Sequence, residues 1–356
     1  MEMNAEFWRG KSVFLTGHTG FKGSWLSLWL QSMGAEVHGF ALEPPTKQNI
    51  FTTANVQDGM VKSTTGDIRE MEKLIKSMQL AKPQIVFHLA AQPLVRYSYE
   101  HPVETYSVNV MGTVHMLEAA RATPSVKAVV NITTDKCYEN REWVWGYREN
   151  EAMGGFDPYS SSKGCAELVT SAYRQSFFDD ANIGLASVRA GNVIGGGDWA
   201  EDRLVPDLLR SIDAGEKLII RSPDATRPWQ HVLEPLSGYL LLAEKLHTSG
   251  TIFSGAWNFG PADTDARPVR WIIENIARMR KDLKWEIDDS SQPHEAGYLK
   301  LDSSKASNQL SWYPQWKLKT ALQKTLEWHE AWHEGKDMRI QSLLQITDYL
   351  NGNGNN

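Results

Sequence analysis

The sequence has few cysteines, no long apolar run and no excess of basic residues. Its two cysteines, Cys137 and Cys165, have the spacing of neither a disulfide framework nor a metal site. No stretch approaches 18 uninterrupted apolar residues, and the N-terminus lacks a basic region followed by an apolar signal core. The formal net charge of -6 argues against a surface for nucleic acid or anionic membrane. We therefore expect a cytoplasmic protein with no nucleic-acid or membrane partner.

Strands and helices alternate along the first half of the chain. SVFLT at residues 12–16 is a short apolar strand, and apolar residues then recur at helical spacing from residue 21 to Gly34. The alternation continues through VHGFAL, GMVKSTTGD, the helical MEKLIKSM, IVFHLAA, a long helix near residues 103–122 and KAVVNITTD. This pattern predicts right-handed crossovers and an α/β fold, a Rossmann-type doubly wound parallel sheet with helices on both faces.

The length of the chain favours two lobes. At 356 residues it exceeds the size at which a single hydrophobic core stops growing. We expect an NAD-binding Rossmann domain at residues 1–190 and, where the βα rhythm weakens, a smaller α/β lobe for substrate at residues 191–350. A segment near residues 229–260 is a candidate for returning to the first domain, in which case the lobes interleave. The tail at residues 351–356 is expected to be disordered.

A glycine-rich turn, Gly17 to Gly23, follows the first strand and opens the first helix. Glycines there let the turn tighten, a pyrophosphate approach the backbone, and the helix lie close to the sheet. A simple tight turn would also use glycine, but this context favours a dinucleotide. No arginine between residues 24 and 60 is available for a 2′-phosphate, which favours NAD over NADP. Glu43 either binds the ribose or is simply solvated.

Tyr159 and Lys163 stand four residues apart in a helix predicted to open at Pro158, so they share one face. A neighbouring ammonium stabilises phenolate and so lowers the pKa of the phenol from its usual value of about 10. The phenolate can then act as a base near neutral pH. The polar, aromatic loop before Pro158 follows the end of a strand, where open α/β sheets place their ligands. Because the chain has 11 tyrosines, a Tyr-Lys pair at this spacing alone is weak evidence for a catalytic pair. The glycine turn earlier in the chain supports that interpretation.

The chain resembles the extended short-chain dehydrogenase/reductase family over essentially its whole length. Three motifs occur in that family's order and spacing: TGHTGFKG, HLAAQ and YSSSK. Within that family, AAQPLVRYSY, ITTDKCYEN, RAGNVIGGGDW and RPWQHV look most like the CDP-glucose 4,6-dehydratases. The resemblance implies a lyase of deoxysugar biosynthesis, such as that of lipopolysaccharide O-antigen, that converts CDP-D-glucose to CDP-4-keto-6-deoxy-D-glucose and recycles its NAD. It also implies a homodimer, or a tetramer, that pairs the helix near residues 103–122 and the helix from Pro158.

The resemblance assigns roles in a three-stage reaction. Tyr159, assisted by Lys163, takes the proton of the sugar 4-hydroxyl while C4 is oxidised. Thr134 hydrogen-bonds the 4-oxygen and Asp135 is the acid that protonates the 6-hydroxyl. Lys136 takes the position of the C5 base, where related thymidine-nucleotide enzymes carry glutamate. Because a lysine pKa must fall by roughly three units to be neutral at pH 7, Lys136 either becomes that base or stays charged and steadies the enolate.

The same resemblance, together with the need for positive charge near a diphosphate, predicts the residues that contact cofactor and substrate. It predicts no metal ligands. The predicted cofactor contacts are Gly17, His18, Thr19, Gly20, Phe21, Lys22, Gly23, Asp67, Ile68, Leu89, Ala90, Ala91, Thr133, Tyr159 and Lys163. The predicted substrate contacts are Gln92, Asn192, Arg203, Arg227, His231 and Tyr298. Arg203, Arg227 and His231 would face the diphosphate, or equally lie at the surface. His18 and Lys22 are larger than the residues common in this turn in the family.

Three other functions compete. His329-Glu330-Ala331-Trp332-His333 matches the zinc-protease motif H-E-x-x-H, although its tryptophans also suit an amphipathic terminal helix. A non-catalytic dinucleotide-binding protein would keep the glycine turn without needing Tyr159 or Lys163. Another nucleotide-sugar dehydratase, an epimerase or a dehydrogenase of the same family would share the turn and the Tyr-Lys pair. Asp135 with Lys136 discriminates against the epimerase, because an epimerase expels no water.

Overall fold

The computed structural model describes residues 4–288 and 296–352 of the chain. Its centre is a sheet of seven parallel strands in the order β10-β6-β5-β4-β1-β2-β3. These strands are β1 (Ser12–Thr16), β2 (Glu36–Ala41), β3 (Lys62–Thr65), β4 (Ile85–His88), β5 (Ala128–Ile132), β6 (Gly184–Arg189) and β10 (Gly255–Asn258). The strand order reverses between β1 and β4, which creates a crevice at their carboxyl ends, so the predicted Rossmann-type sheet is confirmed.

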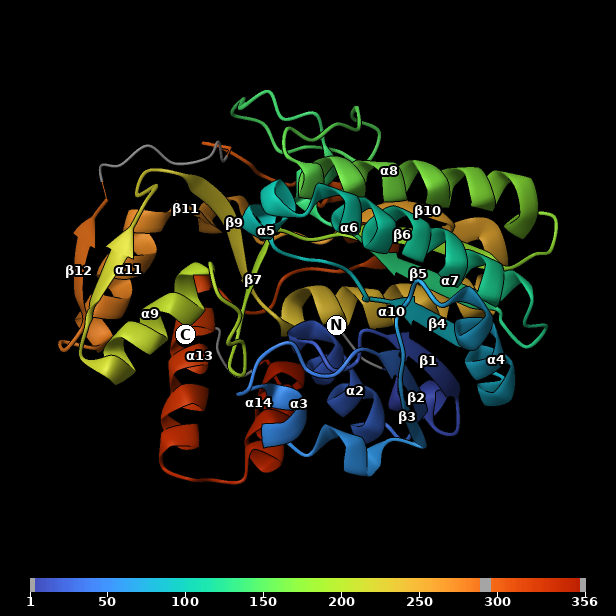
Figure 1. Ribbon diagram of the computed structural model, residues 1–356, viewed down its shortest axis with the longest axis horizontal. Helices are drawn as coiled ribbons and strands as arrows, with labels where there is room; N and C mark the ends of the chain where they lie inside the picture. Colours follow the sequence, from blue (N-terminus) through green and yellow to red (C-terminus); the bar gives the residue numbers. More distant parts are fainter. Residues whose placement is uncertain (1–3, 289–295, 353–356) are drawn as a thin grey trace.

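Helices cover both faces of this sheet (Figure 1). One layer contains α4 (Met71–Ala81), α5 (Val95–Glu100), α6 (Pro102–Tyr106), α7 (Gly112–Arg121) and α8 (Pro158–Tyr173). The other contains α2 (Phe21–Ser32) and α10 (Leu233–Ser249), with α14 (Met338–Leu350) packed on α2. Two short helices, α1 (Ala5–Trp8) and α3 (Ile50–Thr53), adjoin that second layer. The long helix expected near residues 103–122 is α6 and α7 joined by a π-helical turn, Ser107–Met111.

Alternate residues of each central strand enter different hydrophobic cores. Phe14 of β1 packs in the core with α4 and α7, whereas its neighbours Val13 and Leu15 pack in the core with α2 and α10. The tryptophans Trp25 and Trp29 of α2 are fully buried in this second core. This two-sided burial explains why the strands read as continuous apolar runs.

The later part of the chain builds a smaller layer beside the sheet (Figure 1). It has a three-stranded sheet, β11-β9-β7, and a two-stranded sheet, β12-β8. The elements are β7 (Asn192–Ile194), β8 (Lys217–Ile220), β9 (Thr226–His231), β11 (Ala266–Pro268), β12 (Lys284–Ile287), α9 (Leu204–Ala214), α11 (Val269–Met279) and α13 (Leu318–His333). The short helix α12 (Ser304–Leu310) packs instead on α10 and β10 beside the large sheet. α9, α11 and α13 enclose a separate core that includes Leu208, Ile272 and Leu322.

The chain crosses between these two parts more than once. After β9 it returns through α10 to the large sheet, where β10 pairs with β6 as the last strand. The division at residue 190 stays a prediction. Of the expected disordered tail, residues 353–356 lie outside the described residues. Within the described part of the chain, no helix combines the length and the apolarity needed to cross a membrane.

Candidate active site

At two of the three glycines of the turn, the surrounding protein leaves no room for a side chain. Gly17 has a φ of +76°, and a Cβ there would lie 2.6 Å from the backbone nitrogen of Ala90. A Cβ on Gly23 would lie 2.2 Å from the carbonyl oxygen of Gly17, so the helix needs glycine to approach the turn. On Gly20, by contrast, a Cβ would meet protein only at 3.4 Å. The protein thus leaves the face at Gly20 open, as a phosphate-binding turn requires.

The first turn of α2 offers its backbone N–H groups to a ligand. Gly20 is its N-cap and, having no side chain, provides no cap for those groups. Thr19 donates its hydroxyl to the carbonyl of Leu42, 2.9 Å away, which fixes the turn against the end of β2. An anion at this helix end would satisfy the free donors and the helix dipole.

The two unusual residues of the turn lie on different sides of it. His18 is buried, its Nε2 is 2.7 Å from the hydroxyl of Ser63, and burial lowers its pKa to about 4. Lys22 extends into the crevice, where it interacts electrostatically with Asp135, Lys163 and Arg203. Burial and those two cations lower the pKa of Lys22 to about 8. His18 is therefore directed toward β3, and Lys22 adds positive charge to the crevice.

The loop after β4 forms the other wall of the crevice. The hydroxyl of Thr16 accepts from the backbone nitrogen of Ala90, 3.2 Å away, and lies 2.7 Å from Nδ1 of the buried His88. Leu89, Ala90 and Ala91 are partly exposed here. The amide of Gln92 is turned into the protein, with Nε2 donating to Leu94 and to the hydroxyl of Thr105. These hydrogen bonds of the Gln92 amide stabilise the loop.

The residues expected at the adenine side lie at the end of β3. Asp67 is half-buried and paired with Arg69 at 2.6 Å, and its hydrogen bonds with Arg69 lower its pKa. Ile68 is buried against Gly112. Glu43 accepts a hydrogen bond from Thr65 at 2.9 Å and is exposed.

A tight turn at the end of β5 carries the proposed elimination residues. Asp135 begins the 3-10 turn Asp135–Cys137, which Thr134 caps with its hydroxyl. Asp135 is 2 % exposed, and its Oδ2 has no hydrogen-bond partner among the described residues. Burial raises its pKa, against the opposing charges of Lys136, Arg227 and Lys22. A buried carboxyl with a raised pKa and a free oxygen is suited to protonate a ligand.

Tyr159 and Lys163 lie on the buried face of α8, one turn apart. Burial raises the pKa of Tyr159 to about 12, although a hydrogen bond with Thr134 and the charge of Arg203 oppose this. Burial also lowers the pKa of Lys163 to about 8, and its Nζ donates to the carbonyl of Ile132, 3.3 Å away. The pKa of the phenol is thus raised and not lowered as expected, because burial outweighs the hydrogen bond with Thr134 and the charge of Arg203.

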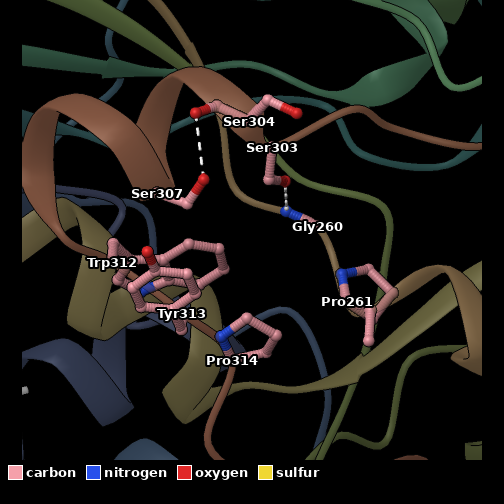
Figure 2. A pocket seen from close by; sticks show the side chains of 9 residues that line it. Gly260, Pro261, Ser303, Ser304, Ser307, Trp312, Tyr313 and Pro314 are labelled. Carbon is pink, nitrogen blue, oxygen red and sulfur yellow. Dashed lines mark hydrogen bonds between the residues drawn. The ribbon is translucent and has the colours of Figure 1, made fainter.

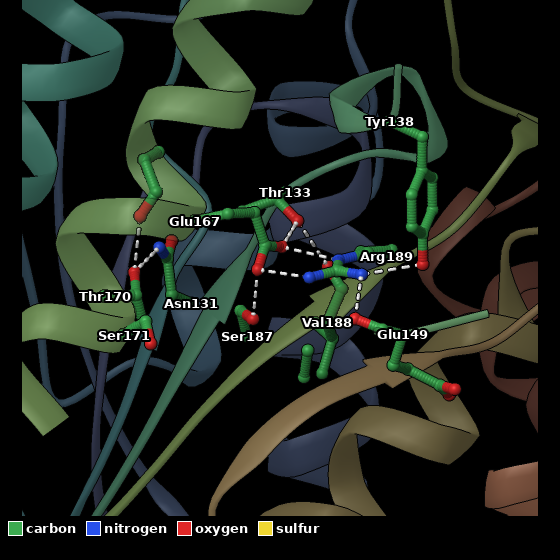
Figure 3. A network of polar contacts seen from close by, with 12 residues as sticks. Asn131, Thr133, Tyr138, Glu149, Glu167, Thr170, Ser171, Ser187, Val188 and Arg189 are labelled. Carbon is green, nitrogen blue, oxygen red and sulfur yellow. Dashed lines mark hydrogen bonds and ion pairs between the residues drawn. The ribbon is translucent and has the colours of Figure 1, made fainter. Parts of the chain in front are cut away.

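A buried ion pair, which we did not anticipate from the sequence, holds α8 against the sheet (Figure 3). Glu167, one turn after Lys163, pairs with Arg189 of β6 at 2.8 Å, and both side chains are under 5 % exposed. Thr133 donates to Glu167, so its hydroxyl points into this network, and Tyr138 accepts from Arg189 at 2.6 Å. The network fixes the helix that carries Tyr159 relative to β6 and to the end of β5, where the turn with Thr134 and Asp135 begins.

Further residues that we did not single out fix the start of α8. Asp157 is its N-cap and accepts from the backbone nitrogen of Ser160 at 2.9 Å. An aspartate followed by proline at the first helical position is a recognisable start signal, so the sequence held this information. Asn109 of the π-helical turn donates to the hydroxyl of Ser162 at 2.9 Å.

Of the basic substrate candidates, the structure brings two to the site. Arg203 precedes α9, pairs with Asp198 at 2.9 Å and interacts electrostatically with Tyr159 and Lys22. Arg227 of β9 is buried and interacts electrostatically with Asp135. His231 is fully buried between Trp25 and Trp316, and burial lowers its pKa to about 3. It is thus a neutral core side chain here, and its diphosphate role stays a prediction.

Asn192 and Tyr298 flank the same small sheet. Asn192 begins β7 and is half-buried. Tyr298 forms a bridge with Thr226, next to Arg227, and its ring lies 5.5 Å from the ammonium of Lys300. Both remain predicted substrate contacts.

A separate surface hollow of about 390 Å³ lies between the loop after β10 and α12 (Figure 2). Trp312, Tyr313 and Pro314 form one wall, and Gly260 donates to Ser303 at its edge. No predicted site residue lines it. The candidate active site is therefore the crevice at the carboxyl ends of the strands and not this hollow.

Comparisons with known proteins agree with this arrangement. Residues 14–325 match the family described as GDP-mannose 4,6 dehydratase. The CDP-glucose 4,6-dehydratase of Salmonella typhimurium is 59% identical over 354 residues, covering 98% of each chain. The dTDP-glucose 4,6-dehydratase of Bacillus anthracis, solved with NAD, has a TM-score of 0.75 at 22% identity and covers 93% of this chain and 100% of its own. A Thermotoga maritima UDP-glucose 4-epimerase, solved with UDP-glucose, has a TM-score of 0.77 at 22% identity and covers 88% and 97%.

Proposed function

Because the chain belongs to the GDP-mannose 4,6 dehydratase family of extended short-chain dehydrogenases/reductases, we propose that it is an NAD-dependent lyase. It converts CDP-D-glucose to CDP-4-keto-6-deoxy-D-glucose and water. The observation that carries the proposal is Asp135, a buried carboxyl with a raised pKa beside Thr134 and Tyr159, and the Oδ2 of Asp135 meets no hydrogen-bond partner in the described part of the chain. Loss of water needs an acid at the 6-hydroxyl, whereas an epimerase or a simple dehydrogenase does not.

The crevice fits NAD by its own features. The open face at Gly20 and the uncapped start of α2 suit the pyrophosphate, and Glu43 follows β2 at the position for the ribose. The NAD reported in the Bacillus anthracis structure supports this assignment. When bound, NAD would accept a hydride from C4, return it to C6 and add the positive charge of its oxidised ring to the site.

Tyr159 then removes the proton of the 4-hydroxyl. The charge of Arg203 and a hydrogen bond with Thr134 favour phenolate, but burial raises the pKa of the phenol to about 12. Thr134, hydrogen-bonded to Tyr159, is in place to share the proton and hold the 4-oxygen. The 4-ketone that results acidifies the C5 proton.

The turn at Thr134–Lys136 carries out the elimination. Asp135 gives its proton to the 6-hydroxyl, which leaves as water. Lys136, half-buried beside Asp135, removes the C5 proton and returns one to C5 when the hydride reaches C6. With Lys136 as the base the atoms balance, because the proton that Tyr159 takes from the 4-hydroxyl makes up for the one that Asp135 gives to the leaving water, and the hydride taken from C4 ends on C6. A Lys136 that stays charged would only stabilise the enolate, and the C5 proton would then need another acceptor.

Local positive charge supports a nucleotide-diphosphate substrate. Lys22 interacts electrostatically with both Lys163 and Arg203, within a chain of net charge -6. They would neutralise the phosphates of a nucleotide sugar. The cytidine base is proposed from the Salmonella typhimurium relative, because none of these contacts identifies a base.

The proposal is tested by incubating the full chain with NAD and, separately, with CDP-, UDP-, GDP- and dTDP-glucose. The expected result is a 4-keto-6-deoxy product, seen by its ultraviolet absorbance in alkali, from CDP-glucose above the others. An Asp135→Asn variant should still oxidise C4, because Tyr159 is intact, yet release little product. No product from any of the four substrates would refute the proposal.

We also propose a homodimer, or a tetramer built from such dimers, in the cytoplasm. The outer faces of α6 to α8 expose several large apolar side chains, and such a patch suits a helix-bundle interface. They are Val103 at 82 %, Leu168 at 61 % and Met111 at 46 % exposure, and Phe177, in the turn that continues α8, is 42 % exposed. Cys137 and Cys165 are unpaired, in keeping with a reducing compartment.

A further inference from the structure

Two histidines and an aspartate converge where α9 contacts α13, away from the residues of the proposed reaction (Figure 1). His329 and His333 lie four residues apart on α13, so their imidazoles share one face. Asp213 lies in the last turn of α9. From the sequence we expected the two histidines to belong to an ordinary amphipathic helix, and Asp213, 116 residues before His329, was not considered.

The donor atoms are as close together as ligands of one metal ion. Nε2 of His329 is 3.0 Å from Oδ1 of Asp213, Nε2 of His333 is 2.8 Å from the same oxygen, and the two nitrogens are 3.2 Å apart. A tetrahedral zinc ion, with bonds of about 2.0–2.1 Å, holds its ligand atoms roughly 3.3 Å apart. The circle through the three atoms has a radius below about 2.0 Å, so one ion can reach all of them.

Hydrogen bonds alone do not account for this arrangement. A neutral imidazole has one N–H, and each Nε2 would need it to hydrogen-bond Asp213. The contact between the two Nε2 atoms would then bring two donors together without a bond between them. A metal ion removes this conflict, because each nitrogen becomes an acceptor directed at the ion.

We propose that Asp213, His329 and His333 bind a divalent transition-metal ion of the zinc type, which fastens α9 to α13. Imidazole and carboxylate are ligands that such ions accept. His333 is 47 % exposed, so water can supply the fourth ligand, while His329 is 4 % exposed and anchors the site in the protein. Arg280, which interacts electrostatically with His329 and Asp213, opposes the added charge and is itself paired with Asp282.

The arrangement differs from a metalloprotease site that uses the same motif. Glu330 would have to act as the general base there. Its carboxylate instead lies 3.7 Å from the guanidinium of Arg280 and is about half exposed. The proposed ion is therefore a structural link between two helices, and α9 is the helix that follows Arg203.

The test uses the untagged full chain after chelation and dialysis. Zinc titration followed by elemental analysis should give one ion for each chain, and Co²⁺ should give the strong visible absorbance of tetrahedral coordination. His333→Gln and Asp213→Asn should weaken zinc binding by more than the 10–100-fold typical of losing an outer partner of a metal ligand. Glu330→Gln is the matched control from the same motif and should bind as the unaltered chain does.

Thermal unfolding provides a second measurement. Zinc should raise the Tm of the unaltered chain and of Glu330→Gln, because it binds only the folded state, but not that of His333→Gln. Since His333 is half exposed, this variant should fold, and its Tm without metal verifies that. Equal zinc binding by His333→Gln and the unaltered chain, or the weak spectrum of hydrated octahedral Co²⁺, would overturn the proposal.

Discussion

Glu167 and Arg189 join α8 to β6 through a buried ion pair 2.8 Å long, from side chains that are 4 % and 3 % exposed. The carboxylate also accepts from Thr133 and from Ser187, whose hydroxyl is 2.6 Å away. Its pKa is nevertheless lowered, because the charge and hydrogen bonds of Arg189 outweigh the desolvation of the carboxyl. The pair is therefore ionised at neutral pH and braces the helix that carries Tyr159.

Replacing Glu167 by Gln should destabilise the protein strongly. It leaves Arg189 buried without a counter-charge, which typically costs about 3–5 kcal/mol of unfolding free energy, as urea titration would show. Glu118→Gln is the control, because its pair with Arg121 is exposed and should contribute below about 1 kcal/mol. Because the pKa of Glu167 is lowered, its stabilisation should be present above pH 4.5 and lost as the pH falls further. Equal losses in the two variants would contradict the assigned role.

Buried histidines should make the protein less stable as the pH falls below 6.5. Burial lowers the pKa of His18 to about 4 and of His88 and His231 to about 3, so the unfolded chain takes up protons first. Each contributes a slope of about 1.4 kcal/mol per pH unit down to its folded pKa. Glu234 opposes them between pH 7 and 4.5, because burial raises its pKa to about 7.

The slope itself is the measurement for this pH dependence. Urea unfolding at several pH values between 6.5 and 4.5 should show a shallower dependence for His231→Gln, by about 1.4 kcal/mol per pH unit. An unchanged slope would mean that His231 is protonated in the folded protein.

The role of Lys136 can be read from hydrogen exchange at the product. In deuterated water, the Lys136→Ala variant should lose deuterium incorporation at C5 of the sugar, while substrate binding persists. Lys127 precedes the other end of the same strand and is exposed, so Lys127→Ala serves as control. Unchanged incorporation and turnover in Lys136→Ala would exclude it from the C5 step.

We expect replacement by alanine to have different effects at Gly20, on the open face of the glycine turn, and at Gly17, where the backbone of Ala90 lies close. Gly20→Ala should fold with a loss below about 1 kcal/mol, since its Cβ meets protein only at 3.4 Å, yet bind NAD at least about tenfold more weakly. Gly17→Ala should instead destabilise the fold, because its Cβ would collide with Ala90 at a positive φ. Calorimetric NAD titration and urea unfolding distinguish the two, and unchanged NAD affinity in Gly20→Ala would place the pyrophosphate elsewhere.

The proposed dimer depends on the apolar face of α6 to α8. Leu168→Glu should put a charge on that face and convert the dimer to monomer in light scattering, with a tetramer reduced in the same way. Leu344→Glu is a control on α14, where Leu344 is 52 % exposed. A monomer in the unaltered chain, or a dimer insensitive to Leu168→Glu, would contradict this interface.

The sequence predicted the elements of the large sheet well, because residues 12–16 and 85–88 are buried on both faces and stand out as apolar runs. It also predicted the shared face of Tyr159 and Lys163, since helical spacing alone decides that. It did not predict the Glu167–Arg189 pair or the contact of Asp213 with His329. Those contacts join distant segments, and periodicity reveals which face is buried but not what lies against it.

Burial also changed the chemistry of individual residues in ways that residue type could not reveal. The family resemblance and charge logic predict His231 as a diphosphate contact, but the rings of Trp25 and Trp316 enclose it. Gln92 was chosen for its place after β4, and its amide is occupied by Leu94 and Thr105. The pKa of Tyr159 follows from desolvation, which depends on everything packed around it.

The place of β10 beside β6 has a consequence for how the protein forms during synthesis. β6 ends at Arg189, but its partner on that side does not emerge until Gly255–Asn258 have been made. Until then β6 is an open sheet edge, the kind of edge that invites pairing with other chains. A newly made chain halted before β10 should therefore depend on chaperones, whereas one that has completed β10 should not.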